Sequence, residues 1–200
     1  MNFDPSKSYR LENERVLLRP LCQDDFEHLM EFSLKEPELW TYSLIPANGE
    51  ENLKSYMEHA LLERKKGSSY PFIVWDKQFG EYAGSTRFYD IQPKHNTLQL
   101  GYTWYGKKFQ GTGLNKQCKL LLLTFAFEDA GVDRVEFRAD AKNARSIAAM
   151  KSIGCTPEGI LRSNCASPNG RRDSIVLSIL KDEWFSKVKP ELITKIFPNA

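Results

Sequence analysis

The chain has 200 residues, 41% of them hydrophobic and 12% aromatic, and a formal net charge of +2. Such a composition can bury a core and excludes a disordered chain, which would hold fewer apolar residues and a larger net charge. The near balance of basic and acidic residues argues against a dedicated nucleic-acid binder, which usually carries a concentrated basic excess. We expect one domain over residues 1–200, with a loose N-terminus over residues 1–10.

Membrane, metal and redox signals are weak in this sequence. No apolar run approaches the roughly 18 residues of a membrane span, and the first ten residues contain no apolar signal segment. The cysteines form no CxxC pair and are expected to be reduced thiols, two of them in the core. They are Cys22, Cys118, Cys155 and Cys165. His28, His59 and His95 lack metal-ligand spacing. We therefore predict a cytoplasmic protein with no metal and no membrane partner.

The first third of the chain predicts one strand and two helices. Arg15–Leu21 is apolar and typical of a strand. Asp24 and Asp25 offer an N-cap to the apolar-periodic run that follows them. A second helix is expected over Glu50–Lys66, because its apolar residues fall on one side and Gly67 can end it.

Three runs rich in β-branched and aromatic residues come next. They cover residues 70–76, 81–91 and 97–105. Turn residues separate them by short distances, which favours an antiparallel meander.

In the second half, helices and strands alternate. In chain order we expect a helix over Leu114–Ala130, a strand over Arg134–Ala139, a helix over Ala144–Ile153 and a strand over Cys155–Cys165. Asn169 and Gly170 suit a type I′ hairpin turn before a returning strand over residues 173–180. Residues 182–200 predict a helical tail interrupted at Pro190. The pattern predicts an α+β fold whose mixed sheet is antiparallel at first and then contains a strand–helix–strand unit.

A Gly-Thr-Gly sequence stands directly before the helix that begins at Leu114. Helix N-termini carry unpaired N–H groups and partial positive charge, and glycines let these amides converge on an anion. Four lysines surround the junction, namely Lys107, Lys108, Lys116 and Lys119. A bare GxG, however, is more often a tight turn with solvated lysines around it.

Two common nucleotide motifs are absent here. The stretch does not match GxxxxGK[ST], and Lys116 stands where GxGxxG needs its third glycine. A nucleoside triphosphate and a dinucleotide are therefore disfavoured, whereas a pyrophosphate group is not.

Three pieces of sequence together resemble one known family. The first is Lys108–Gly113, read against the acetyl-CoA signature [Q/R]-x-x-G-x-[G/A] with Lys108 replacing the usual Gln or Arg. The second is Asn143 and Ser146 followed by Gly154, and the third is the ending "EGILR…PNGRRDSIVLSIL". In this order they resemble the GNAT superfamily of acetyl-CoA-dependent N-acetyltransferases, in its RimJ/RimL-type branch. The resemblance covers nearly the whole chain and implies a mostly antiparallel, twisted mixed sheet flanked by helices.

The resemblance also implies the site. The implied acetyl-CoA-binding residues are Thr103, Trp104, Tyr105, Lys108, Phe109, Gln110, Gly111, Thr112, Gly113, Leu114, Asn115, Asn143 and Ser146. Main-chain groups of the strand should pair with the pantetheine arm as an added strand would, and loop amides should bind the pyrophosphate. Ser146 is the implied catalytic residue, as a donor to the departing thiolate, although a first-turn serine is also common in ordinary helices. Asn143 should bind the cofactor arm and is equally suited to cap its helix.

The implied reaction is direct transfer of acetyl to a primary amine, which needs a base and an oxyanion donor. Many relatives carry a Glu two residues before the Gly of E-x-G-Y, where this chain has Gln99. Since glutamine is not a base, either another group takes the proton or the amine loses it to water, and four other groups are candidates. They are Glu81, Asp90, His95 and Glu158.

The acceptor stays open at this point. By analogy with the family, the first two helices and residues 42–50 form one wall of its site. Aromatic residues suited to line it are Trp40, Tyr42, Tyr89 and Tyr102, unless they serve only in packing. A protein N-terminus, a polyamine, an amino acid or an aminoglycoside would all supply an amine, to a monomer or a homodimer.

Two rival functions compete with catalysis. A non-catalytic acetyl-CoA-binding regulator is supported by Gln99. An RNA-binding module would use Lys107, Lys108, Arg171 and Arg172. The small net charge and the lack of an aromatic RNA-binding signature speak against RNA, so we predict no nucleic-acid partner.

Overall fold

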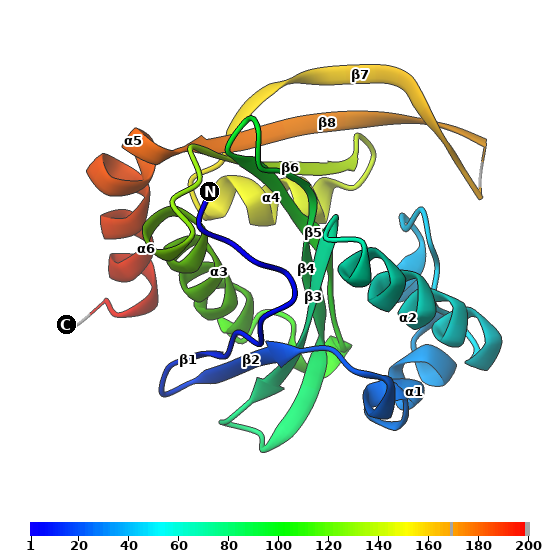
Figure 1. Cartoon of the computed structure of the whole chain (residues 1–200). Helices are drawn as coiled ribbons and strands as arrows, with labels where there is room; N and C mark the ends of the chain where they lie inside the picture. Colours follow the sequence, from blue (N-terminus) through cyan, green and yellow to red (C-terminus); the bar gives the residue numbers. More distant parts are fainter. Residues whose placement is uncertain (169, 199–200) are drawn as a thin grey trace.

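The computed structural model describes residues 1–168 and 170–198. Its strands form one eight-stranded sheet in the order β1-β2-β3-β4-β5-β6-β8-β7 (Figure 1). The strands are β1 (Leu11–Glu12), β2 (Val16–Pro20), β3 (Ser69–Asp76), β4 (Glu81–Gln92), β5 (Thr97–Tyr105), β6 (Arg134–Asp140), β7 (Thr156–Ser167) and β8 (Gly170–Leu180). Among the strands of the described residues, only β5 and β6 pair in parallel. The predicted α+β fold with a mixed, mostly antiparallel sheet is confirmed.

Helices cover both faces of the sheet. They are α1 (Phe26–Lys35), α2 (Glu50–Lys65), α3 (Leu114–Thr124), α4 (Ala144–Ser152), α5 (Lys181–Glu183) and α6 (Lys189–Ile196). In Figure 1, α1 and α2 lie on one side of the central strands, and α3, α4 and α6 lie on the other. Among the described residues, no helix combines the length and apolar character needed to cross a membrane.

The alternation of β3 explains the two-sided packing. Phe72 and Val74 belong to the large apolar cluster that includes the buried face of α3. Ile73, between them, points to a second cluster with Tyr56 and Met57 of α2. Because both faces of β3 are buried, the strand is apolar almost throughout.

The N-terminal segment, expected to be loose, packs against the core. It contains no helix or strand before Leu11. Nevertheless, the Phe3 ring lies 5.5 Å from the Tyr70 ring, and the Asn2 N–H donates to the Ala130 carbonyl over 2.7 Å. The contact between the Phe3 and Tyr70 rings and the hydrogen bond from Asn2 to Ala130 therefore help to hold this segment against the core.

Three local predictions need comment. Asp25 stands at the N-cap of α1 as expected, but its side chain makes no capping hydrogen bond, because the carboxylate binds Arg19 over 2.9 and 2.5 Å instead. The predicted interruption at Pro190 is wrong. A π-turn over Trp184–Val188 precedes α6, whose first turn accepts Pro190 because N–H groups there need no helical partner. The predicted Asn-Gly turn includes Asn169, which lies outside the described residues.

Gly84 offers a test of the packing between β4 and β5. Its φ is +150°, and an added Cβ would collide with the main-chain carbonyl of Trp104. Because backbone atoms cannot yield as a flexible side chain can, Gly84→Ala should lower the free energy of unfolding by about 3 kcal/mol. Urea denaturation would measure the change. Gly159→Ala is the matched control, since its added Cβ meets no atom within 4 Å. Equal stability of the two variants would contradict this packing.

Candidate functional site

The sheet opens where β5 and β6 separate. β6 pairs with β5 only along Thr97–Gln99, although it pairs with β8 along its whole length. The edge of β5 beyond Gln99 therefore has no ladder partner on β6 in the described part of the chain. A cavity of about 720 Å³ lies at this opening and is lined by both strands, the Gly-Thr-Gly loop and α4.

A bulge in β5 shapes the same opening. Ser85 of β4 pairs with Trp104, and Arg87 pairs with Gly101, so β5 contains one extra residue between these pairs. Tyr102 within it has a φ of +49°, which is uncommon outside glycine. As a result, Tyr102 and Trp104 pack with the cluster around α1 and α2, on the opposite face of the sheet from Leu98 and Leu100 earlier in the strand. No local pattern in the sequence predicts this bulge.

The Gly-Thr-Gly loop has the features of an anion site. Gly111 and Gly113 have φ values of +76° and +87°, and added Cβ atoms there would meet nothing within 4 Å. Within residues 1–168 and 170–198, the N–H groups of Gly111, Thr112 and Gly113 donate to no protein acceptor. Since α3 begins immediately after Gly113, the helix terminus adds its partial positive charge. The loop therefore fits a phosphate group.

Most of the predicted acetyl-CoA residues line this one cavity. They are Thr103, Trp104, Tyr105, Phe109, Gln110, Gly111, Gly113, Asn115, Asn143 and Ser146. Three predicted residues do not. Lys108 Nζ pairs with Glu81 over 2.5 Å, the Thr112 hydroxyl donates to the Phe109 carbonyl over 2.8 Å, and the Leu114 side chain is fully buried in the core. The cation expected from Lys108 thus lies outside the cavity wall.

Another cation occupies the entrance of α4. Asn143 caps this helix, with its Oδ1 accepting the Ser146 N–H over 3.1 Å. The exposed Arg145 donates from Nη1 to Gln110 Oε1 over 2.6 Å and so joins α4 to the glycine loop. Arg145 and the half-buried Lys116 both line the cavity. Sequence reasoning missed Arg145, although its place in the first turn after an Asn cap was a usable signal.

Lys119 is a buried cation in the wall of the cavity. Its side chain is 5% exposed, and Nζ donates to Thr103 Oγ1 over 3.0 Å. Burial lowers the pKa of this lysine to about 8, because a desolvated ammonium is disfavoured. The sequence placed Lys119 near the loop but did not predict its burial. The signal was present, since Leu122 and Leu123 follow it at helical spacing on the buried face of α3.

Asp90 and Gln99 form a hydrogen-bonded pair at the other end of the cavity. Gln99 Nε2 donates to Asp90 Oδ2 over 2.7 Å, and Gln92 Nε2 donates to Oδ1 over 2.6 Å. Asp90 is exposed and has a φ of +46°. Gln99 is 6% exposed, and its Oε1 is buried with no hydrogen-bond partner among the described residues. An N–H donor entering the cavity would satisfy that oxygen.

Of the four base candidates, only Asp90 lines the cavity. Glu81 binds Lys108. Glu158 binds Arg134 and accepts from the Ser178 hydroxyl, and the hydrogen bond from Arg134 lowers the Glu158 pKa to about 2. These contacts hold both carboxylates in ion pairs away from the opening.

Aromatic side chains line the part of the cavity next to α2. The residues named from the sequence, Trp40, Tyr42, Tyr89 and Tyr102, all contribute. The rings of Tyr89 and Tyr102 meet edge-on at 5.0 Å. Gly101 makes room for this pair, because an added Cβ would lie 2.9 Å from the Tyr89 ring. Burial raises the pKa of both tyrosines, so their hydroxyls stay protonated donors at neutral pH.

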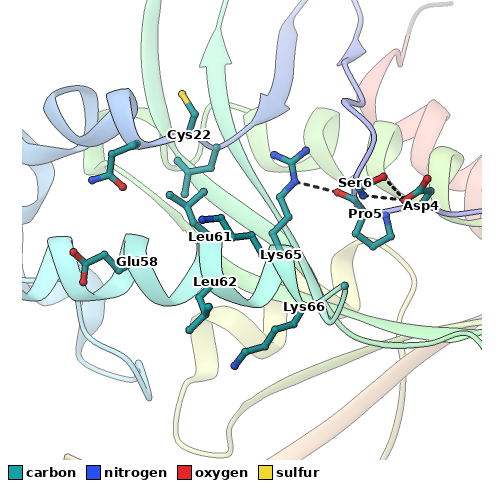
Figure 2. A pocket seen from close by; sticks show the side chains of 13 residues that line it. Asp4, Pro5, Ser6, Cys22, Glu58, Leu61, Leu62, Lys65 and Lys66 are labelled. Carbon is teal, nitrogen blue, oxygen red and sulfur yellow. Dashed lines mark hydrogen bonds between the residues drawn. The ribbon is translucent and has the colours of Figure 1, made fainter.

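A second cavity, of about 870 Å³, lies between the N-terminal segment and α2. Figure 2 shows its lining, with Leu61, Leu62 and Lys65 on the helix and Pro5 opposite them. It contains none of the residues predicted for acetyl-CoA. Of the two cavities, only the one at the β5–β6 opening is lined by residues predicted to bind acetyl-CoA.

The four basic residues considered for RNA binding are engaged or buried. Lys107 pairs with Glu38, and Lys108 pairs with Glu81. Arg171 donates to the carbonyl of Ser163, and Arg172 is 8% exposed and lines the cavity. The two lysines thus pair with carboxylates and Arg172 is buried, whereas the exposed Arg171 contacts a neighbouring carbonyl of its own hairpin.

Comparison with known proteins agrees with this geometry. A family model described as "Acetyltransferase (GNAT) domain" matches residues 15–156. YdaF of Bacillus subtilis strain 168, whose name proposes a ribosomal N-acetyltransferase, is 25% identical over 177 residues, covering 86% of this chain and 94% of YdaF. A structure from T. thermophilus, described as a proposed acetyltransferase, is 33% identical, with a TM-score of 0.83 over 93% of this chain and 96% of that chain.

The structure of RimL, described as a ribosomal L7/L12 alpha-N-protein acetyltransferase in complex with coenzyme A, shares the fold. Its TM-score is 0.75 at 19% identity, over 87% of this chain and 99% of that chain. The family model and the 33% identical structure each cover well over half of the chain. The chain therefore belongs to the GNAT acetyltransferase family, and its relatives agree with the RimJ/RimL-type branch that its sequence resembles.

Proposed function

We propose that the chain transfers an acetyl group from acetyl-CoA directly to a primary amine. One observation carries this proposal: the glycine loop, whose N–H groups donate to no acceptor in the described residues, and the strand edge of β5 without a ladder partner border the same cavity. The first suits the diphosphate of coenzyme A, and the second suits its amide-containing arm. Both features belong to main-chain atoms and so do not depend on the change at Lys108.

The cosubstrate would be held chiefly by backbone. N–H groups of Gly111, Thr112 and Gly113 would bind the diphosphate, with Arg145 and Lys116 adding positive charge nearby. Main-chain groups of β5 from Thr103 to Tyr105 would pair with the pantetheine amides. Amide groups of Gln110, Asn115 and Asn143 border the same channel. Acetyl-CoA supplies the activated acyl group, and the protein positions it.

The amine needs to lose a proton before it attacks. Asp90 is the base that the cavity geometry favours, because it is the candidate carboxylate on its wall. Gln99 would orient Asp90 through its amide and accept an N–H of the incoming ammonium at its unpartnered Oε1. The carboxylate that relatives place on β5 would thus be replaced by one on β4, joined to Gln99 by a hydrogen bond.

The negative charge that develops on the oxygen and sulfur during acyl transfer also needs hydrogen-bond donors. N–H groups on the β5 edge beyond Gln99 would stabilise the oxyanion. The Ser146 hydroxyl, on the cavity wall in the first turn of α4, would donate to the departing thiolate. No covalent enzyme intermediate is required, so the cysteines need no role in the reaction.

The acceptor would enter from the side of α1 and α2, between the aromatic residues there. A protein N-terminus is our first candidate, because relatives are named for ribosomal protein N-acetylation. Polyamines, amino acids and aminoglycosides present the same reactive group. We retain from the sequence the predictions of a cytoplasmic monomer or homodimer.

A thiol-release screen would test the proposal. The full chain would be mixed with acetyl-CoA and peptides with free N-termini, spermidine, free amino acids or an aminoglycoside, and coenzyme A release would be followed. Release that depends on one amine class supports catalysis. Tight acetyl-CoA binding by calorimetry without release for any amine would instead favour the non-catalytic regulator.

Ser146→Ala should lower kcat about tenfold or more while changing the Kd of acetyl-CoA by less than about twofold. The reason is that a leaving-group donor acts in the transition state more than in the bound complex. Steady-state kinetics and calorimetry would separate the two effects. Ser186→Ala, in the C-terminal π-turn, is the control. An unchanged kcat would make Ser146 an ordinary first-turn serine.

A further inference from the structure

Lys119 is a lysine amine buried within the cavity wall rather than on the surface. Its only side-chain hydrogen bond in the described residues goes to Thr103 Oγ1, over 3.0 Å. Thr103 Oγ1 in turn lies 2.7 Å from Thr86 Oγ1. Neither partner is an anion, so the ammonium form gains little at this position.

The position of Nζ places it between the diverging strands. It contacts Thr103 on β5 and lies 6.0 Å from the centroid of the Phe137 ring on β6. Both of these residues line the cavity. A group that binds Thr103 and lies near Phe137 is at the opening between the two strands, beside the strand edge proposed for the pantetheine arm.

The titratable groups that act on Lys119 would favour its charge only as thiolates. They are the thiols of Cys118 on α3 and Cys155 at the end of α4. Burial raises the pKa of each thiol to about 12, so both are neutral at physiological pH. No carboxylate in the described residues forms an ion pair with Nζ. With a lysine pKa of about 8, about a tenth of the amine is neutral at pH 7, against roughly one part in two thousand for an exposed lysine.

We propose that Lys119 is a self-acetylation site, at which Nζ takes the acetyl group of acetyl-CoA bound in the same cavity. This inference rests on the proposed use of acetyl-CoA. It does not depend on the amine acceptor, on Asp90 or on Ser146.

The step balances without an added reagent. The Nζ lone pair attacks the thioester carbonyl carbon, an N–C bond forms, and the C–S bond breaks. The proton released from Nζ passes to the sulfur, and coenzyme A leaves as the free thiol. Lys119 becomes a neutral acetyl-lysine that keeps one N–H for Thr103. Because the added group would occupy the opening, the modified protein should bind acetyl-CoA more weakly.

Mass spectrometry of the full chain would test the proposal. The protein would be incubated with acetyl-CoA and no amine, and acetylation at each lysine would be followed by peptide mapping at pH 6 to 9. Lys119 should react at least about tenfold faster than exposed lysines. Its rate should rise about tenfold per pH unit below pH 8 and level off above it.

Matched variants complete the experiment. Lys119→Arg keeps the charge and a donor for Thr103 but should abolish the fast phase, whereas Lys151→Arg, at an exposed position on α4, should keep it. The wild-type map alone decides the matter if Lys119→Arg fails to fold. If calorimetry shows that acetyl-CoA binds but Lys119 is acetylated no faster than exposed lysines, the self-acetylation site alone is overturned. Failure of acetyl-CoA to bind at all would overturn the proposed function as well.

Discussion

Replacing Gly111 by aspartate should raise the Kd of acetyl-CoA by about 100-fold or more. The new carboxylate would lie within the set of N–H groups proposed for the diphosphate. Like charges about 4 Å apart repel by about 1 to 4 kcal/mol between water-like and protein-surface dielectric values, and each 1.4 kcal/mol is tenfold in affinity. Isothermal titration calorimetry of the purified variant would measure the change.

The control for this variant separates charge from backbone strain. Gly67 has a φ of +78°, almost the +76° of Gly111, and an added Cβ would meet nothing within 4 Å at either residue. Gly67→Asp therefore carries the same strain at the end of α2, away from the cavity. It should bind acetyl-CoA like the wild type. A folded Gly111→Asp protein with unchanged affinity would remove the diphosphate from this loop.

Asp90→Asn should lower kcat/KM for the amine about 100-fold, with little effect on acetyl-CoA binding. Asparagine keeps the size of the side chain but cannot take a proton, and general-base catalysis contributes roughly 100- to 10,000-fold. The loss should shrink at high pH, because a larger fraction of the amine is then neutral without a base. Stopped-assay kinetics between pH 6 and 10 would follow both trends.

Asp129→Asn is the matched control for Asp90, as an exposed carboxylate after α3. It should leave kcat/KM unchanged. Gln99→Ala should reproduce part of the Asp90 defect, since it removes one of the two amides that hold the carboxylate. Full activity of Asp90→Asn at pH 7 would mean that water or another group accepts the proton.

The elements could be predicted from the sequence because their signals are local. Runs rich in β-branched and aromatic residues, with turn residues between them, predicted β3, β4 and β5, and Gly67 marked the end of α2. The errors came from side-chain contacts that no local pattern shows. Asp25 looked like a cap, but its carboxylate binds Arg19 of β2, six residues earlier. Likewise, nothing near Phe3 signals that it packs on Tyr70.

The candidate site shows the same division. The left-handed backbone of Gly111 and the helix cap at Asn143 could be predicted, because both depend on the local chain. For side chains that contact other elements of the fold, the sequence could not choose among the base candidates and predicted the wrong position for Lys108. Lys108 turned to Glu81, and Asp90 emerged among four candidates only when β4 and β5 were paired. The burial of Lys119 likewise requires β5 and β6 to be in place.

The extra residue in β5 also restricts how this chain can change length. Side chains before the bulge and after it point correctly only because two successive residues face the same way. Deleting or inserting one residue between Gly101 and Trp104 would send one flank of the strand to the wrong face of the sheet. Insertions and deletions among homologues should therefore occur in loops such as residues 93–96. They should be absent from this strand segment, even where single residues of the strand are substituted.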